Sequence, residues 1–288
     1  MGHSALSVRA AAAALVILAG QSSGQDLIYG VTSNQTLVTW DPSNPGALLS
    51  GVALSGFAPS ESVRGIDFRP ATGELYALGS FSNLYTINPA TGAATLVGPG
   101  PFTPALNGSS FGFDFNPTID RIRVVSDVNQ NMVLNPNTGT ATQVTPVFYA
   151  AGDANEGTDP NVVASAYTNS FFGATTTQLY GIDTGLDILV TQANSAGTLV
   201  TVGALGLDLN DTATFEITGV SGIAYGTVQT SDQSRSIFWS VNLVTGESFT
   251  IGDIGGGALI TAITSVPAPG MGALLASVGM GLALRRRR

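Results

Sequence analysis

Repetition is the feature that most limits what this 288-residue chain can fold into. The segment 65–70, GIDFRP, returns one repeat later as GFDFNP at 112–117, and an alternating strand follows each copy. The next segments, 84–92 and 132–139, both end in Thr-Gly, and a short strand closes each unit. The unit is therefore a four-stranded antiparallel meander of about 45–52 residues, which is the size of a propeller blade.

Two weaker copies of this unit follow, from Val162 and from Thr214. The N-terminal region supplies only three strands, and one spare strand remains near the C-terminus, at 259–264. If the spare strand is innermost, the two ends build a fifth blade together and leave no free edge. The chain is predicted to be an all-β, five-bladed β-propeller, with a β-sandwich or a six-bladed ring as alternatives.

The composition removes many kinds of chemistry. Cysteine is absent, the sole histidine is His3, and the ten basic residues are all arginine. A Ser-His-Asp triad, a Schiff base and zinc sites of the His or Cys kind are thereby excluded from the domain. Residues 25–265 hold all 19 acidic residues and only five arginines, a net charge of −14. Such a domain repels nucleic acid and anionic lipid.

Residues 1–24 read as a secretory signal peptide. Arg9 supplies a positive charge, no acidic residue precedes Asp26, and Ala10–Ala19 is an unbroken apolar run. That run has the length of a signal-peptide core and is too short to span a bilayer. We expect export and removal of this segment by signal peptidase.

The C-terminal segment 266–288 has three parts. Val266, Pro267, Ala268 and Pro269 break the chain, 271–284 is apolar and uncharged, and Arg285, Arg286, Arg287 and Arg288 end it. We expect a short transmembrane helix whose arginines stay cytoplasmic. The arrangement resembles the PEP-CTERM sorting signal, here with Ala268 in place of the central Glu. The resemblance implies an inner-membrane-tethered intermediate, then processing by an exosortase and transfer to the cell surface or extracellular matrix of a Gram-negative bacterium.

The central region also resembles a bacterial family, the domain of unknown function 4394, over roughly residues 27–266. The similar segments are GIDFRPATG at 65–73, RIRVVSD at 121–127, AYTN at 166–169 and LYGID at 179–183. The resemblance implies a secreted propeller and carries no established activity, so it assigns no catalytic residue.

Three acidic residues, Asp67, Asp114 and Glu216, occupy the same place on the first strand of three repeats. First strands line the central channel of a propeller, so these carboxyls should converge. They could pair with arginines or backbone amides between blades, bind a cation, or serve as acid and base. The first reading is favoured by Arg64, Arg69, Arg121 and Arg123 in the same repeats. Arg64, Arg121 and Arg123 are alternatively candidates for ligand binding.

The most acidic loop contains Asp153, Asn155 and Asp159, whose oxygens at alternate positions suit Ca²⁺. The EF-hand order is not met, so an ordinary solvated turn is the alternative. Ca²⁺ is the one cofactor that the sequence suggests.

These features favour a binding or structural role at the cell surface, with exopolysaccharide or a surface protein as partner, rather than an enzyme. One alternative is a glycan-active enzyme that uses Asp67, Asp114 and Glu216. Another is a Ca²⁺-stabilised scaffold with no ligand of its own.

Overall fold

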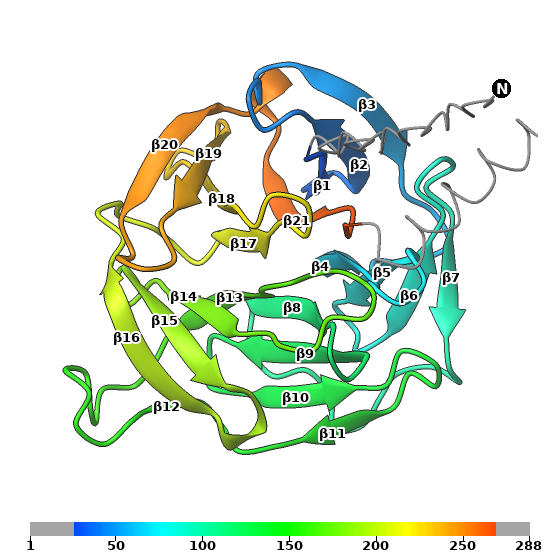
Figure 1. Ribbon diagram of the computed structural model, residues 1–288. Helices are drawn as coiled ribbons and strands as arrows, with labels where there is room; N and C mark the ends of the chain where they lie inside the picture. The colour runs from blue at the N-terminus through cyan, green and yellow to red at the C-terminus, as the bar shows by residue number, and fades with distance from the viewer. Residues whose placement is uncertain (1–25, 269–288) are drawn as a thin grey trace, which may run out of the picture.

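The computed structural model describes residues 26–268, which form five mainly antiparallel sheets around a common axis (Figure 1). The prediction of a five-bladed β-propeller is confirmed, and the β-sandwich and the six-bladed ring are excluded. The predicted signal peptide, apolar C-terminal helix and arginine cluster lie outside the described residues. Within residues 26–268, no helix is long and apolar enough to cross a membrane.

The blades are numbered here along the chain, and the innermost strand of each is given first. Blade 1 contains β21 (Ile260–Ser265), β1 (Ile28–Thr32), β2 (Thr36–Trp40) and β3 (Leu48–Ala53). Blade 2 contains β4 (Val63–Phe68), β5 (Leu75–Gly79), β6 (Leu84–Ile87) and β7 (Ala94–Val97). Blade 3 contains β8 (Phe111–Asn116), β9 (Arg121–Ser126), β10 (Asn131–Leu134) and β11 (Ala141–Gln143).

Blade 4 contains β13 (Val162–Tyr167), β14 (Leu179–Asp183), β15 (Ile188–Ala193), β16 (Thr198–Ala204) and β12 (Phe148–Tyr149). Blade 5 contains β17 (Thr214–Ile217), β18 (Ala224–Gln229), β19 (Ser236–Val241) and β20 (Ser248–Asp253). Two short 3₁₀ turns, η1 (Asn194–Ala196) and η2 (Gly255–Gly257), complete the elements of the described chain.

Blade 1 joins the two ends of the domain, as the sequence predicts. The C-terminal strand β21 pairs antiparallel with β1 and is the innermost strand of the blade. Figure 1 shows the orange β21 beside the blue β1 at the centre of the ring. The pairing removes the free edge that β1 would otherwise expose.

The extra strand β12 in blade 4 is not predicted by the sequence. It is two residues long and pairs parallel with β16 at the outer edge, Phe148 opposite Thr198. A strand this short carries no alternating pattern, so periodicity cannot detect it.

The hydrophobic core is divided among the five seams between neighbouring blades. For example, Leu78 and Leu84 of blade 2 pack with Phe115 and Ile122 of blade 3. Trp40 of blade 1 packs in the same way on Phe238 of blade 5, edge to face at 5.6 Å between ring centroids. Because neighbouring blades cover both faces of an inner strand, β5 and β8 are buried along their whole length. The ring therefore has no single central core.

The predicted Thr-Gly turns allow the blades to approach closely at their outer edges. Gly92 and Gly139 end two of these turns with φ of +72° and +69°. A Cβ at Gly92 would lie 2.2 Å from the carbonyl oxygen of Ala53, and one at Gly139 would lie 2.4 Å from that of Val97. Glycine is therefore required at both turns by the positive φ and by the contact with the preceding blade.

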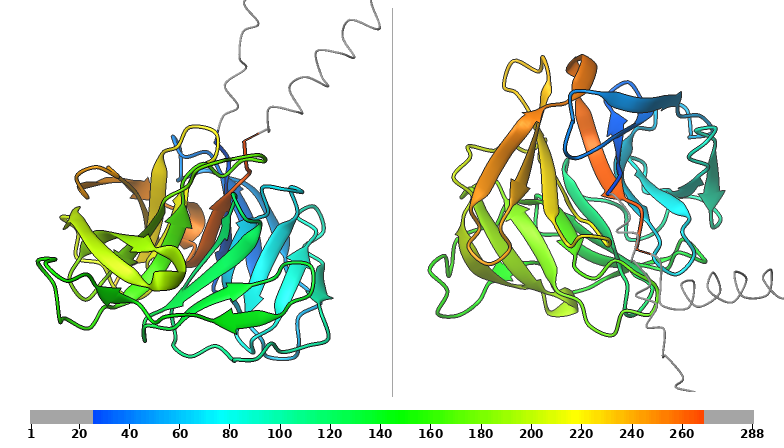
Figure 2. Two further views of the ribbon diagram at one scale, coloured as in Figure 1. Left: turned by 60° about the horizontal axis from the view of Figure 1, so that its bottom comes forward. Right: turned by 45° about the horizontal axis from the view of Figure 1, so that its top comes forward.

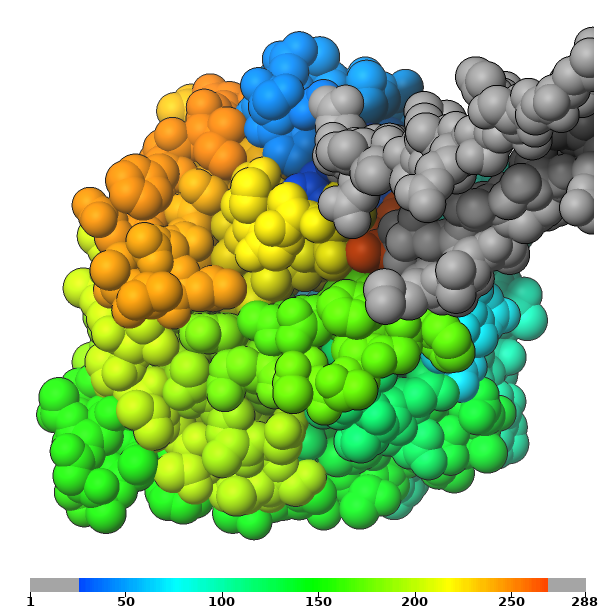
Figure 3. Space-filling model, viewed as in Figure 1, coloured from blue at the N-terminus to red at the C-terminus, as the bar shows by residue number. Residues whose placement is uncertain are grey.

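The two ends of the described chain lie on one face of the ring, which we call the closed face. Strand β21 ends there, and the Ala268 N–H beyond it donates to the Ser170 carbonyl at 3.1 Å. At the other end of the chain, Asp26 accepts hydrogen bonds from Thr218 and Ser221. Figure 3 shows the segments around 220 and 268 meeting at the centre of this face, and Figure 2 shows the ring from two further angles.

Candidate functional site

The five innermost strands surround the central channel and bring the three predicted carboxyls together. Asp67 on β4, Asp114 on β8 and Glu216 on β17 are buried, and a carboxylate oxygen of each lies within 4.8 Å of the others. They come from three different blades that are far apart in sequence. The convergence predicted from their equivalent repeat positions is therefore observed.

Each carboxyl reaches across a seam to the first strand of the next blade. Asp67 accepts the Phe115 N–H at 2.7 Å, and Asp114 accepts the Tyr167 N–H at 3.1 Å. Glu216 accepts the Ser265 hydroxyl at 2.6 Å.

A second hydroxyl on the closing strand β21 also bonds to one of the three carboxyls. The Thr264 hydroxyl donates to Asp67 at 2.8 Å. Four of the five seams are thus bridged at this level of the channel. The fifth seam lies between blades 4 and 5. On β13 of blade 4, the position equivalent to Asp114 is Ala166, which has no carboxyl group to bridge this seam.

The expected arginine partners are not found, although the expected backbone amides are. Arg69 forms its ion pair with Asp120 in the next blade. Arg123 is buried, and it donates to Asn131 at 2.8 Å and to Tyr167 and Ser195 at longer distances. In residues 26–268, no arginine bonds to Asp67, Asp114 or Glu216. The expectation of arginine pairing is therefore wrong for these carboxyls.

Burial without a basic partner favours the protonated form of all three groups. Burial raises the pKa of Asp67 to about 7, despite the hydrogen bonds that it accepts. The pKa values of Asp114 and Glu216 are raised well above their usual range, by burial first and then by neighbouring carboxyls. Three carboxylates this close cannot all be ionised unless a cation joins them. Three convergent oxygens are also the donor type that Ca²⁺ accepts.

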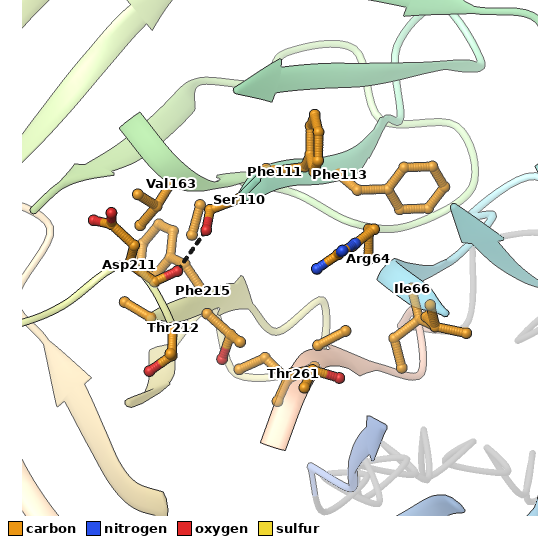
Figure 4. A pocket seen from close by; sticks show the side chains of 18 of the residues that line it. Arg64, Ile66, Ser110, Phe111, Phe113, Val163, Asp211, Thr212, Phe215 and Thr261 are labelled. Atoms are coloured by element: carbon orange, nitrogen blue, oxygen red, sulfur yellow. Dashed lines mark hydrogen bonds between the residues drawn. The ribbon is translucent and has the colours of Figure 1, made fainter. Parts of the chain in front are cut away.

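A cavity of about 310 Å³ lies at the other end of the channel, on the side that we call the open face (Figure 4). Its walls include the N-terminal halves of β4, β8, β13, β17 and β21, so all five blades contribute. Gly65, Gly112 and Thr214 line it, and Asp67, Asp114 and Glu216 lie two residues further along the same strands. The carboxyls themselves are not among the lining residues.

The cavity wall mixes polar and apolar side chains, and Arg64 and Asp211 are its two charged residues in the described part of the chain. Phe111 and Phe113 border the cavity, but their rings point away from its centre and are buried in the seam between blades 2 and 3. Of the three arginines that the sequence singles out, Arg64 lines the cavity, Arg123 is buried between blades, and Arg121 donates to the Asp120 carbonyl. Five serines also contribute to the wall: Ser33, Ser62, Ser109, Ser110 and Ser165.

Sequence reasoning misses the serines and phenylalanines of this cavity. Most of them lie in loops and at strand starts, where no repeat pattern marks them. The one available signal is the repeated glycine at Gly65 and Gly112, because a Cβ at Gly112 would lie 2.2 Å from the Ser165 hydroxyl. A glycine kept at the same place in two repeats indicates a close contact on the channel side.

The polar side chains of the acidic loop, Asp153, Asn155 and Asp159, form hydrogen bonds with other residues of the protein. Asp153 accepts the N–H and the hydroxyl of Thr201, both at 2.8 Å, and Asn155 donates to the same hydroxyl. Asp159 instead accepts from Asn129 at 2.6 Å. The three candidate Ca²⁺ ligands thus bond to partners on two different segments.

Fold and site together define a five-bladed β-propeller with three buried carboxyls near its axis and a cavity on one face. The sequence profile of the domain of unknown function family DUF4394 matches residues 36–264, and the chain belongs to this family. No curated protein matches the chain significantly.

Similarity to solved structures is confined to the fold. The chain is similar to one in the crystal structure of a nidogen–laminin complex, with 11% identity and a TM-score of 0.50, over 84% of this chain and 98% of that one. A protein of unknown function from Bacteroides thetaiotaomicron is 13% identical with a TM-score of 0.48, over 83% and 66% of the two chains. At such identities the likeness carries no activity over.

Proposed function

We propose that this chain is an exported cell-surface binding module that recognises its ligand in the cavity on the open face. The observation that carries the proposal is the cavity itself. It is concave, it lies on the propeller axis, and residues of all five blades line it. Its volume of about 310 Å³ is at the lower end of the range for small-molecule sites, roughly 300–1,000 Å³.

Binding is better supported than catalysis by the position of the carboxyls. Asp67, Asp114 and Glu216 are buried and hydrogen-bonded between blades, and they do not line the cavity. A general acid must come within hydrogen-bond reach of the atom that it protonates. A role in joining the blades fits these three residues better than a glycosidase mechanism.

The position of the ends suits a tethered protein. Strand β21 ends at the closed face, and Pro267 and Ala268 follow it there. The cavity lies at the other end of the channel. During a tethered intermediate, the open face would point away from the membrane, toward exopolysaccharide or a surface protein. Export by the signal peptide and release by an exosortase are part of this proposal.

Replacing Arg285–Arg288 with glutamine should block processing, because the terminal arginines hold the tail in the cytoplasmic leaflet for the exosortase. Immunoblots of cell fractions should show the variant as a larger membrane-bound species, whereas the unmodified chain is shortened and reaches the surface. Arg235→Gln, which changes an exposed arginine of the propeller, is the control. Equal size and location of the variant and the unmodified chain would contradict the sorting proposal.

The variant Ser109→Trp should weaken ligand binding at least about tenfold, because an indole at this exposed position would fill part of the cavity. The measurement is binding of the purified full chain to exopolysaccharide extracted from the producing cells. Ala71→Trp is the matched control, since Ala71 is also exposed but lies in the β4–β5 turn at the closed face. Undiminished binding by Ser109→Trp would mean that the cavity is not the site.

A further inference from the structure

In the described part of the chain, the Arg64 guanidinium stands without a partner. Within residues 26–268, no hydrogen bond or ion pair involves its guanidinium, although 19 acidic residues share the domain with five arginines. Arg69 and Arg235, by contrast, pair with Asp120 and Asp253. Figure 4 shows the Arg64 side chain pointing toward the centre of the cavity.

The one acidic residue of the cavity wall faces other groups. The Asp211 carboxylate accepts Asn161 at 2.8 Å and Thr184 at 2.7 Å, and neither of these residues lines the cavity. Its backbone carbonyl accepts the Ser110 hydroxyl at 2.6 Å. Arg64 is therefore the charged group left to meet a ligand.

A second polar group in the cavity is also unused. Ser165 is 2% exposed and lines the cavity, and its hydroxyl has no hydrogen-bond partner in the described part of the chain. A buried hydroxyl without a partner carries a desolvation cost that a bound ligand would remove. Ser165 lies over Gly112, where any larger residue would exclude it.

The remaining surface suits a compact, hydroxylated molecule. The serine and threonine hydroxyls of the wall can exchange hydrogen bonds with the hydroxyl groups of a sugar ring. Arg64 adds a planar donor that matches a carboxylate in bidentate fashion. Below the cavity, burial raises the pKa values of the three channel carboxyls, so in protonated form they add no negative charge there.

From these contacts we infer that the cavity binds a carboxylated sugar, such as a uronic acid residue, through Arg64 and Ser165. The inference rests on the proposed function and names the ligand class of the same site. It predicts that binding is selective for the acidic sugar over its neutral counterpart.

The test is calorimetric titration of the full chain with glucuronic acid and galacturonic acid disaccharides and with the matched neutral disaccharides. Binding of an acidic sugar should fall at least about tenfold in Arg64→Gln and should be largely kept in Arg64→Lys. Arg235→Gln is the control and should bind as the unmodified chain does. Arg64 is exposed and makes no hydrogen bond or ion pair within residues 26–268, so its variants should keep the melting temperature.

Three results would overturn the inference. The first is equal binding of neutral and acidic sugars that survives Arg64→Gln. The second is full competition by inorganic sulfate or phosphate, which would indicate a general oxyanion site. The third is no binding of either sugar class. In each case the exopolysaccharide assay with Ser109→Trp decides separately whether the cavity is the binding site.

Discussion

A chain that stops at Leu259 should not unfold cooperatively, because it lacks the strand that closes the ring. Strand β21 buries Ile260 and Ile263 and covers the inner edge of β1. Burying one such side chain contributes about 1.5–3 kcal/mol, and the exposed edge of β1 would add further loss. Against a typical stability of about 5–15 kcal/mol, these losses together should remove much of the folded population at room temperature.

The measurement is circular dichroism during heating, with a chain that stops at Ala268 as the matched control. That control keeps β21 and the Ala268–Ser170 hydrogen bond, and both chains lack the same tail. A sharp transition in the shorter chain, within a few degrees of the control, would show that four blades and three strands fold without closure.

The second large effect is a loss of stability as the pH rises from about 4 to about 7. The pKa of buried Asp67 is about 7 in the folded chain, against 3.8 for an unperturbed aspartate. Well below pH 3.8, Asp67 is protonated in both the folded and the unfolded chain, and its full contribution to the unfolding free energy is present. Above it the unfolded chain releases the proton first, so the unfolding free energy falls by about 4 kcal/mol from Asp67 as the pH rises through the folded pKa.

Glu216→Gln should flatten this dependence and raise stability above pH 7. Glutamine can still accept the Ser265 hydroxyl, and it removes one of the three adjacent carboxyls. Urea unfolding midpoints over the pH range measure the effect, and Glu247→Gln, exposed between β19 and β20, is the control. Stability that is flat or rises with pH in the unmodified chain would contradict the assignment of protonated channel carboxyls.

The same urea unfolding series, repeated with added Ca²⁺ or with EDTA, shows whether protons or a bound cation neutralise the three channel carboxyls. A Ca²⁺-dependent gain at high pH that Glu216→Gln abolishes would assign the neutralising role to the cation. No response to either addition would assign it to the protons.

The site was predictable where it depends on repetition. Asp67 and Asp114 follow the same glycine and an apolar residue in two copies of one unit, so a shared place near the axis follows from the blade pattern. Their partners were not predictable. The Phe115 and Tyr167 amides are donors of a kind that nearly every residue possesses, and only the packing of adjacent blades selects them.

The sequence predicted five blades and the closing role of the last strand, and the structure removed the alternatives of a β-sandwich and a six-bladed ring. Alternation, Thr-Gly turns and repeat length are local properties, and they act on each unit in the same way. Only the folded chain shows that Arg69 pairs with Asp120, that Arg64 is unpaired within residues 26–268, and that Ser165 lines a cavity. These outcomes depend on contacts between blades about 50 residues apart in the chain, which no local pattern encodes.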